Sequence, residues 1–263
     1  MIVARNVEHP MAESAVSDLF GSLASPFTGE ELFDRLDDLV YFVKNQRAEY
    51  VVVNRTLAER CGERDKRAIL GKTAEEVFPG PLGRSYREQD EAVLRAGAAV
   101  VDQLELHIYP GRDQGWCLTN KLPLWGPEGR IVGLVGSSRD LHPPSERDEG
   151  YEEVAQAVQH ARDHPDERLT LASLAAASGL SGYQFDRRIR RLFRLSTGQL
   201  LLKLRMDAAS GLLRGTDRPV AEIALACGYS DQSAFARQFR RTIGLTPLEY
   251  RSAGRAGTKA KGG

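Results

Sequence analysis

Cysteine is scarce in this chain, and the few cysteines it has are isolated. Cys61, Cys117 and Cys227 form no CxxC pair and stand at no Cys/His spacing of the kind that holds zinc. We therefore expect neither a disulfide framework nor a metal site, and the cysteine usage fits a reducing compartment. Cys227 takes the place of Ser178 in an internal repeat of the chain, so we expect it to be a small packing residue.

Long apolar runs are also missing. No segment reaches the roughly 20 apolar residues that a membrane-spanning helix needs. The N-terminus has neither the basic start nor the apolar stretch of a secretory signal. We expect a soluble, cytoplasmic protein with no membrane partner.

The sequence lacks the common catalytic motifs. It has no phosphate-binding glycine loop before a helix, no HExxH, no GxSxG and no segment like that of histidine kinases. Its five histidines form no cluster with the cysteines; they are His9, His107, His142, His160 and His164. Because catalysis needs a positioned constellation of groups, we expect that the protein is not an enzyme.

A net charge is absent too, but the two halves of the chain differ in sign. Residues 1–150 hold 18 Lys/Arg and 25 Asp/Glu, which gives −7. Residues 151–263 hold 18 and 11, which gives +7. This asymmetry indicates that the C-terminal half is the part that meets nucleic acid.

The basic half contains an internal repeat. Residues 171–181 align with residues 220–230 at an offset of 49 and share five identical residues. After one inserted residue, 185–191 align with 235–241 at an offset of 50. Each copy predicts a short helix, a tight turn at a glycine, and a second helix that begins at a serine cap. The turn glycines are Gly179 and Gly228, and the expected caps are Ser181 and Ser230.

The second helix of each copy has an apolar face and a basic face. The apolar positions at helical spacing are Phe185, Ile189 and Leu192, then Phe235, Phe239 and Ile243. A generic helical bundle can also carry an arginine-rich outer face. Arginines repeated at the same helical phase in two copies favour two DNA-binding helix-turn-helix units. The apolar stretch 200–213, which begins after a Ser196 cap, predicts a connector helix of roughly 22 Å between them.

The DNA contacts are expected on the second helices, which would enter successive major grooves. Base edges should be met by the residues near the start of each helix that lie off the apolar stripe: Tyr183, Gln184, Asp186, Arg187, Gln232, Ser233, Ala236 and Arg237. Phosphates should be met by arginines further along: Arg190, Arg191, Arg240 and Arg241. Arg187 and Arg237 are repeat equivalents, and each can donate two hydrogen bonds to a guanine.

Residues 151–252 resemble the DNA-binding domain of the AraC/XylS family of transcription factors. The most specific stretch is residues 224–251, ALACGYSDQSAFARQFRRTIGLTPLEYR. The resemblance places base-contacting arginines at Arg187 and Arg237 and further contacts at Gln232 and Ser233. It implies double-stranded DNA as a partner, with RNA polymerase as a further one. Two features depart from the family pattern: an acid, Asp186, which would accept from a cytosine amino group or orient Arg187, and Thr197–Leu200 in place of the Pro-x-x-Tyr seen at Pro247–Tyr250.

The acidic half has the element order of an α+β domain with one antiparallel sheet. Strands are predicted at residues 39–43, 50–53, 103–109, 116–124 and 130–137, and a longer helix at 84–95. Capping boxes stand at Thr28 and Thr73. Leu104, Leu106 and Ile108 alternate with polar residues, so we expect them to line a pocket with Phe42 and Trp116. His107 then faces the polar, solvated side.

Residues 30–142 resemble a PAS sensor domain. The matching strings are residues 51–54 (VVVN), 71–79 (GKTAEEVFP) and 121–140, which contains KLPL and GRIVGLVGSSRD. The resemblance implies a cavity for a small-molecule ligand and a sheet face that dimerises, hence a homodimer. The flavin-photosensing and haem signatures are absent, so the cofactor stays unknown.

The expected organisation is a lead-in (1–29), a PAS-like sensor domain (30–142), a hinge (143–150), an AraC-type DNA-binding domain (151–253) and a disordered tail (254–263). The fold class is thus α+β followed by all-α, with two helix-turn-helix units joined by a connector helix. The predicted function is a DNA-binding transcription regulator modulated by its PAS half. In the alternative, the PAS half only dimerises or binds a protein partner, without a small-molecule ligand.

Overall fold

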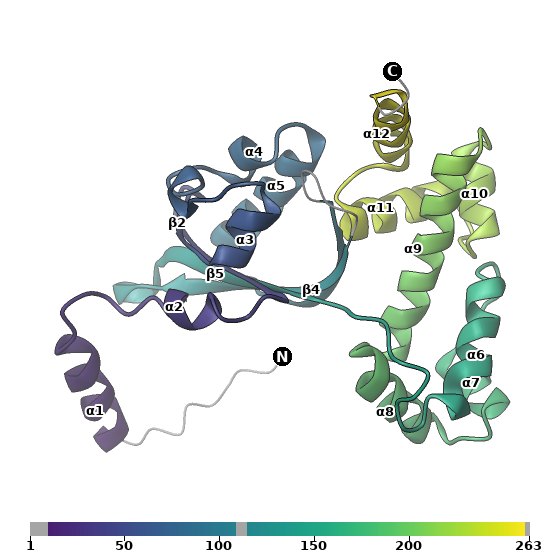
Figure 1. Ribbon diagram of the computed structural model, residues 1–263, viewed down its shortest axis with the longest axis horizontal. Coiled ribbons are helices and arrows are strands. Elements are labelled where there is room, and N and C mark those ends of the chain that lie inside the picture. Colours follow the sequence, from purple (N-terminus) through teal and green to yellow (C-terminus); the bar gives the residue numbers. More distant parts are fainter. Residues whose placement is uncertain (1–9, 109–114, 261–263) are drawn as a thin grey trace.

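The computed structural model describes residues 10–108 and 115–260 and has two parts joined by one connection (Figure 1). The N-terminal part is an antiparallel sheet with flanking helices, and the C-terminal part is all-helical. The α+β and all-α classes predicted from the sequence are therefore confirmed. Among the described residues, no helix is long and apolar enough to cross a membrane.

The N-terminal part is built on a sheet of strand order β2-β1-β5-β4-β3, in which every neighbouring pair is antiparallel. Its strands are β1 (Leu39–Asn45), β2 (Tyr50–Val53), β3 (Val100–His107), β4 (Gly115–Trp125) and β5 (Ile131–Asp140). Its helices are α1 (Pro10–Gly21), α2 (Glu30–Phe33), α3 (Arg55–Arg60), η1 (Lys66–Ala68), α4 (Ala74–Val77), α5 (Pro81–Ala96) and η2 (Pro127–Gly129).

The two faces of this sheet are covered by different parts of the molecule. Successive side chains of a strand point to opposite faces. Phe42 of β1 lies on the inner face, in an apolar cluster with residues of α3, α4 and α5. Leu104 and Leu106 of β3 lie on the outer face, in one apolar cluster with the C-terminal helices. The sheet is thus shared between two cores.

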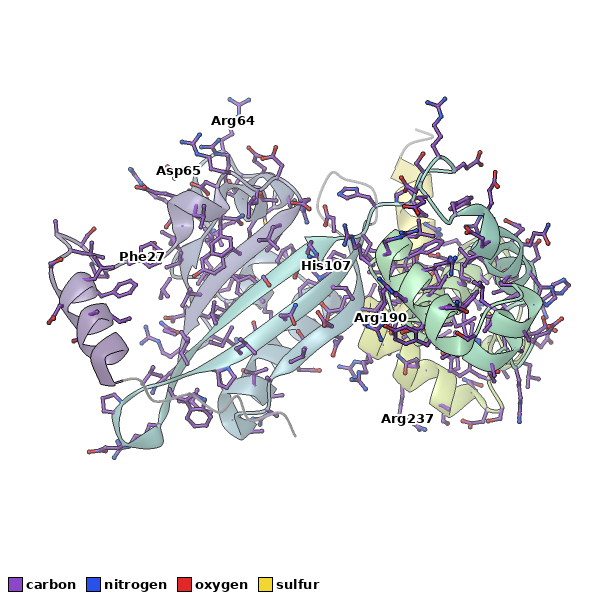
Figure 2. All side chains as sticks on the ribbon, turned by 90° about the horizontal axis from the view of Figure 1, so that it is seen from below. Phe27, Arg64, Asp65, His107, Arg190 and Arg237 are labelled. Atoms are coloured by element: carbon purple, nitrogen blue, oxygen red, sulfur yellow. The ribbon has the colours of Figure 1, made fainter. Side chains whose placement is uncertain are left out.

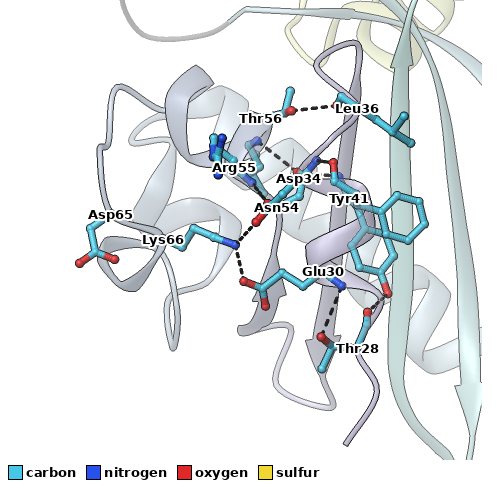
Figure 3. A network of polar contacts seen from close by, with 12 residues as sticks. Thr28, Glu30, Asp34, Leu36, Tyr41, Asn54, Arg55, Thr56, Asp65 and Lys66 are labelled. Carbon is cyan, nitrogen blue, oxygen red and sulfur yellow. Dashed lines mark hydrogen bonds and ion pairs between the residues drawn. The ribbon is translucent and has the colours of Figure 1, made fainter.

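Asn54 at the end of β2 ties the short helices to the sheet (Figure 3). Its side-chain oxygen accepts from the backbone N–H of Leu57, which caps α3, and from that of Tyr41 in β1 at 2.9 Å. Its amide donates to the carbonyl of Leu39 at 2.7 Å. Lys66 closes the same network by bonding Asp34 at 2.7 Å. Asn54 thus caps α3 and holds it against β1.

The C-terminal part follows an irregular segment between β5 and α6, where the hinge is expected. Its helices are α6 (Glu152–Asp163), α7 (Leu171–Ala177), α8 (Gly182–Phe193), α9 (Thr197–Gly215), α10 (Val220–Ala226), α11 (Gln232–Ile243) and α12 (Pro247–Ala260). The predicted apolar stripes of α8 and α11 are buried, with Phe185, Ile189, Phe235 and Phe239 fully enclosed. In this half, the apolar positions identified from the sequence are the ones that the fold buries.

Three expectations about helix ends are wrong. α11 is capped by Asp231, not Ser230, because the carboxylate accepts from the Ala234 N–H at 2.7 Å. The N-cap of α2 is Gly29 in the left-handed conformation, not Thr28, whose hydroxyl accepts from the Glu30 N–H at 3.4 Å. α12 continues to Ala260 through most of the segment expected to be a disordered tail; residues 261–263 lie outside the described part. Once its first turns are anchored by packing, extending a helix costs little.

Candidate nucleic-acid interface

Two helix-turn-helix units lie at opposite ends of α9 (Figure 1). In the first, α7 turns into α8 at Gly179, whose φ is +64°. Ser181 and Gln184 cap α8 reciprocally: the serine oxygen accepts from the Gln184 N–H at 3.2 Å, and the glutamine carbonyl accepts from the Ser181 N–H at 3.0 Å. In the second, α10 turns into α11 at Gly228, with φ +77°. The 19-residue connector α9 spans roughly 28 Å at about 1.5 Å per residue.

Asp186 on α8 has a structural task that the sequence did not reveal. One carboxylate oxygen accepts from both the backbone N–H and the hydroxyl of Thr197, each at 2.9 Å, and the other accepts from Arg190 at 2.6 Å. Thr197 is only 2% exposed, so its donors have little access to water. Burial raises the pKa of Asp186, but the bonds from Thr197 and Arg190 outweigh it and hold the pKa below its ordinary value.

The equivalent junction of the second unit, between α11 and α12, has no charged residue in place of Asp186. Ala236 and Pro247 stand where the first unit has Asp186 and Thr197. Proline has no N–H to satisfy and is well suited to the first position of a helix, which Pro247 occupies in α12. Asp186 and Thr197 therefore belong together: the first unit has this bonded pair where the second unit has Ala236 and Pro247. Neither expected role of Asp186, accepting from cytosine or orienting Arg187, matches the partners it has.

The other residues expected at base edges are mostly exposed at the starts of α8 and α11. Tyr183 is 76% exposed, and Arg187, Gln232, Ser233 and Arg237 are exposed as well, while Ala236 is half-buried. Figure 2 shows Arg237 at the outer edge of the helical half. Gln184 is exposed, but its side-chain carbonyl is engaged in the cap, which leaves its amide N–H groups as donors.

Three of the four arginines expected at phosphates already have partners. Arg190 pairs with Asp186 at 2.6 Å, and Arg191 bonds the backbone carbonyl of Glu149 in the connection between the two parts. Arg240 pairs with Glu88 of α5 at 2.7 Å. Arg241 lines a cleft between α11 and the sheet. These contacts are ones that DNA would have to displace or share.

Family models match both parts of the chain: a helix-turn-helix domain at residues 174–253 and a PAS fold at residues 33–146. The activator RhaR of Mannheimia succiniciproducens is 47% identical over 68 residues, which cover 24% of this chain and 25% of RhaR. The probable regulator LumQ of Photobacterium leiognathi is 29% identical over 35% of this chain and 37% of its own length. The chain thus spans about a quarter of RhaR and a little more than a third of LumQ.

The regulatory protein SoxS of Salmonella typhimurium is 35% identical over 89 residues, which cover 34% of this chain and 83% of SoxS. The chain belongs to the AraC family of transcription regulators. Among solved structures, the DNA-binding domain of AdpA in complex with a target DNA is 36% identical over 40% of this chain and 94% of that one, with a TM-score of 0.38. VqmA bound to DPO is 22% identical over 65% and 87%, with a TM-score of 0.37.

The AraC-type half is docked on the outer face of the PAS sheet. Trp116 of β4 is buried there, and its indole N–H donates to Asp207 of α9 at 2.8 Å. Gln199 of α9 donates to the carbonyl of Asp102 at 2.8 Å. The left-handed Gly244 after α11 lies so close to α5 that a Cβ there would meet Leu82 at 2.9 Å. A cleft of about 400 Å³ remains between α5, β3 and α11.

The expected PAS pocket is not brought together. Phe42 lines a cavity on the inner face, but Leu104, Leu106 and Trp116 belong to the opposite face and pack against the AraC-type half. Ile108 is half-buried at the edge of that outer cluster. The polar members of the alternation, Glu105 and His107, point inward instead and are buried. The prediction took the apolar side of β3 for the cavity side, because it had no signal that a second part covers the outer face.

The inner cavity, of about 40 Å³, is lined by paired charges together with aromatic rings. Asp90 of α5 is fully buried between Lys44 and Lys121, with its bond to Lys121 at 2.6 Å. Burial lowers the pKa of Lys44 to about 8, although Asp90 opposes the change. Burial raises the pKa of Glu105, but His107 and the surrounding donors bring it down to about 2. No sequence pattern pointed to Lys44 or Asp90, because they lie 46 residues apart.

Proposed function

We propose that this protein is a transcription regulator that binds double-stranded DNA with α8 and α11, and that its PAS half controls the access of α11 to DNA. The ion pair between Arg240 and Glu88 carries the proposal. Arg240 follows Arg237 by three residues on the same helix, and it is held by a carboxylate of the PAS half. A phosphate and the Glu88 carboxylate would compete for the same guanidinium.

The coupling follows from the docking of α11 against the PAS half. Binding of DNA to α11 and docking of α11 on α5 and β3 use overlapping surfaces, so a signal that weakens the docking strengthens DNA binding. A ligand in the PAS half acts only through its different affinity for the docked and released arrangements. Homodimer formation, contact with RNA polymerase and a cytoplasmic location belong to this proposal as expectations from the family.

The test compares DNA binding by matched variants of α5. Duplexes are first selected from a random pool by the full chain, and affinities are then measured by fluorescence anisotropy at several salt concentrations. Glu88→Gln should tighten binding by roughly 1.4–5-fold, since an exposed ion pair contributes about 0.2–1 kcal/mol. Glu91→Gln is the control: Glu91 lies on the same helix but pairs with Arg87, within α5.

A larger release is expected from Trp116→Ala, which removes both the packing and the bond to Asp207. Coupling energies of about 1–3 kcal/mol correspond to a change of roughly 5–150-fold in affinity. Sedimentation of the same complexes reports the stoichiometry. Equal affinity for wild type, Glu88→Gln and Trp116→Ala would refute control by docking and leave the alternative, in which the PAS half only dimerises or binds a protein. Absence of any selected duplex would refute the DNA-binding function itself.

A further inference from the structure

Three side chains with metal-binding atoms meet on the inner face of the PAS sheet. They are Glu105 and His107 of β3 and Cys117 of β4, and their ligand atoms all lie within 4.8 Å of one another. All three are buried, with exposures of 5%, 8% and 0%. Figure 2 shows His107 at the end of the sheet that faces the helical half.

The strand register brings the cluster together. Glu105 and Cys117 are directly opposed in the β3–β4 ladder, and His107 follows Glu105 by two residues, so all three point to the same face. His107 Nε2 lies 3.1 Å from a Glu105 carboxylate oxygen. The Cys117 thiol donates to the backbone carbonyl of Glu105 at 3.6 Å. Cys117 therefore lies close to the same residue that pairs with the histidine.

The donor set selects one class of ion. Sulfur, imidazole nitrogen and carboxylate oxygen together suit zinc and related first-row metals, whereas magnesium and calcium take oxygen ligands. A divalent cation bound to a thiolate, a carboxylate and a neutral imidazole forms a unit with no net charge. Such a unit avoids the penalty of burying an isolated charge, which is large away from water.

The distances are close to those of a tetrahedral site. With zinc–ligand bonds of about 2.0–2.3 Å, neighbouring ligand atoms stand roughly 3.3–3.8 Å apart. The 3.1 Å separation of Glu105 and His107 is near this range already, and the remaining separations, all within 4.8 Å, must contract by at most about an ångström. Glu105 and His107 also line the inner cavity, which can supply water as a fourth ligand.

We propose that Glu105, His107 and Cys117 form a three-ligand site for a zinc-class divalent cation, with its fourth position open to the inner cavity. This departs from the sequence expectation of no metal site, because the ligands come from two strands and have no recognisable spacing. The site lies next to α11: Glu105 accepts from Gln103 at 2.7 Å, and the same amide reaches the carbonyl of Arg241 at 3.5 Å. The proposal concerns metal binding and does not rest on DNA binding.

The test uses the untagged full chain, freed of metal by a chelator and kept reduced. Zinc is titrated in competition with a chromophoric chelator, and cobalt is titrated while the absorption spectrum is recorded. We expect one ion per chain, a thiolate-to-cobalt charge-transfer band, and visible bands of tetrahedral intensity. Cys117→Ser should abolish the charge-transfer band, and His107→Gln should weaken zinc binding at least about tenfold, by comparison with the 10–100-fold losses seen when even outer partners of a metal are removed.

The chain offers matched controls in its two other cysteines. Cys61→Ser and Cys227→Ser should keep both the stoichiometry and the charge-transfer band, since neither thiol belongs to the cluster. Zinc should also raise the Tm of wild type and leave that of a folded Cys117→Ser variant unchanged, with far-UV circular dichroism establishing that the variant is folded. Failure of wild type to bind zinc or cobalt stoichiometrically would overturn the proposal. A band that survives in Cys117→Ser, or disappears in Cys61→Ser, would do so as well.

Discussion

The bond between Asp186 and Thr197 at the junction of α8 and α9 can be tested stringently, because the second unit has a different residue pair at the same two positions. Asp186→Ala removes the acceptor of both Thr197 donors, which are almost fully buried. A buried polar group left without a partner costs about 1–3 kcal/mol. We therefore expect Asp186→Ala to lower the free energy of unfolding of the helical half by about 2 kcal/mol, within that range.

Adding Thr197→Pro to this variant should restore most of the loss. The double variant reproduces the Ala236–Pro247 pair of the second unit, in which no N–H or hydroxyl needs an acceptor. The backbone accepts the change, because Ser196 has φ −68° and ψ 159°, the extended conformation that a residue before proline prefers. Thr197 is also the first residue of α9, a favourable place for proline. We expect a coupling of at least about 1 kcal/mol between the two positions.

The assay is urea unfolding of the full chain followed at 222 nm, where the helical half dominates the signal. It is measured for wild type, both single variants and the double variant. The pKa of Asp186 lies below its ordinary value in the folded state, so its contribution is complete above that ordinary value and is lost as pH falls through the folded pKa. The difference between wild type and Asp186→Ala should therefore shrink at pH values below about 4. Additive single effects would refute the pairing, and a changed base preference without lost stability would instead make Asp186 a reading residue.

Three further predictions concern the cavity, the reading face and the turns. Asp90→Asn removes the carboxylate that is bonded to two buried lysines and should cost about 3–5 kcal/mol. Urea unfolding followed by tryptophan fluorescence reports this loss of stability, because both tryptophans lie in the PAS half, and a loss below about 1 kcal/mol would contradict the prediction. Arg237→Ala should cost about 1–3 kcal/mol on a selected duplex and relax the preference at one base pair; equal losses on selected and random duplexes would argue against a base contact. Gly228→Ala should lower the Tm more than Gly179→Ala. Both glycines have positive φ, but only at Gly228 would an added Cβ meet backbone, the carbonyl oxygen of Pro165 at 2.9 Å. Equal Tm shifts in thermal melts followed by circular dichroism would contradict this prediction.

The amino-acid sequence by itself determined the elements and the repeat. The stripe of Phe185 and Ile189, the turn glycines and the caps at Ser181 and Asn54 act over a few residues, so their physics is visible in the local pattern. The same is true of the strand alternation in β3. Its period of two was read correctly, and the family of each half was recognisable from short strings.

Only the tertiary structure decided which side of β3 faces which neighbour. Alternation separates the two faces of a strand but does not say what covers each of them. Here the apolar face of Leu104 and Leu106 packs on the AraC-type half, and the polar face turns into a cavity whose charges neutralise one another. Burial of Glu105 and His107 is tolerated because the two side chains pair with each other on β3 and because Gln89 of α5 donates to Glu105. The partner on α5 leaves no local signal in the sequence.

Tertiary structure also decided which partners the arginines of the two repeat copies have. Arg190 and Arg240 have the same place in the two copies of the repeat, and sequence reasoning gave them the same role. The fold gives one an acid from its own helix and the other an acid from the PAS half. The pair within α8 is local, whereas the pair between Arg240 and Glu88 depends on where a second segment lies in space. This contact between the two halves was therefore decided by their docking.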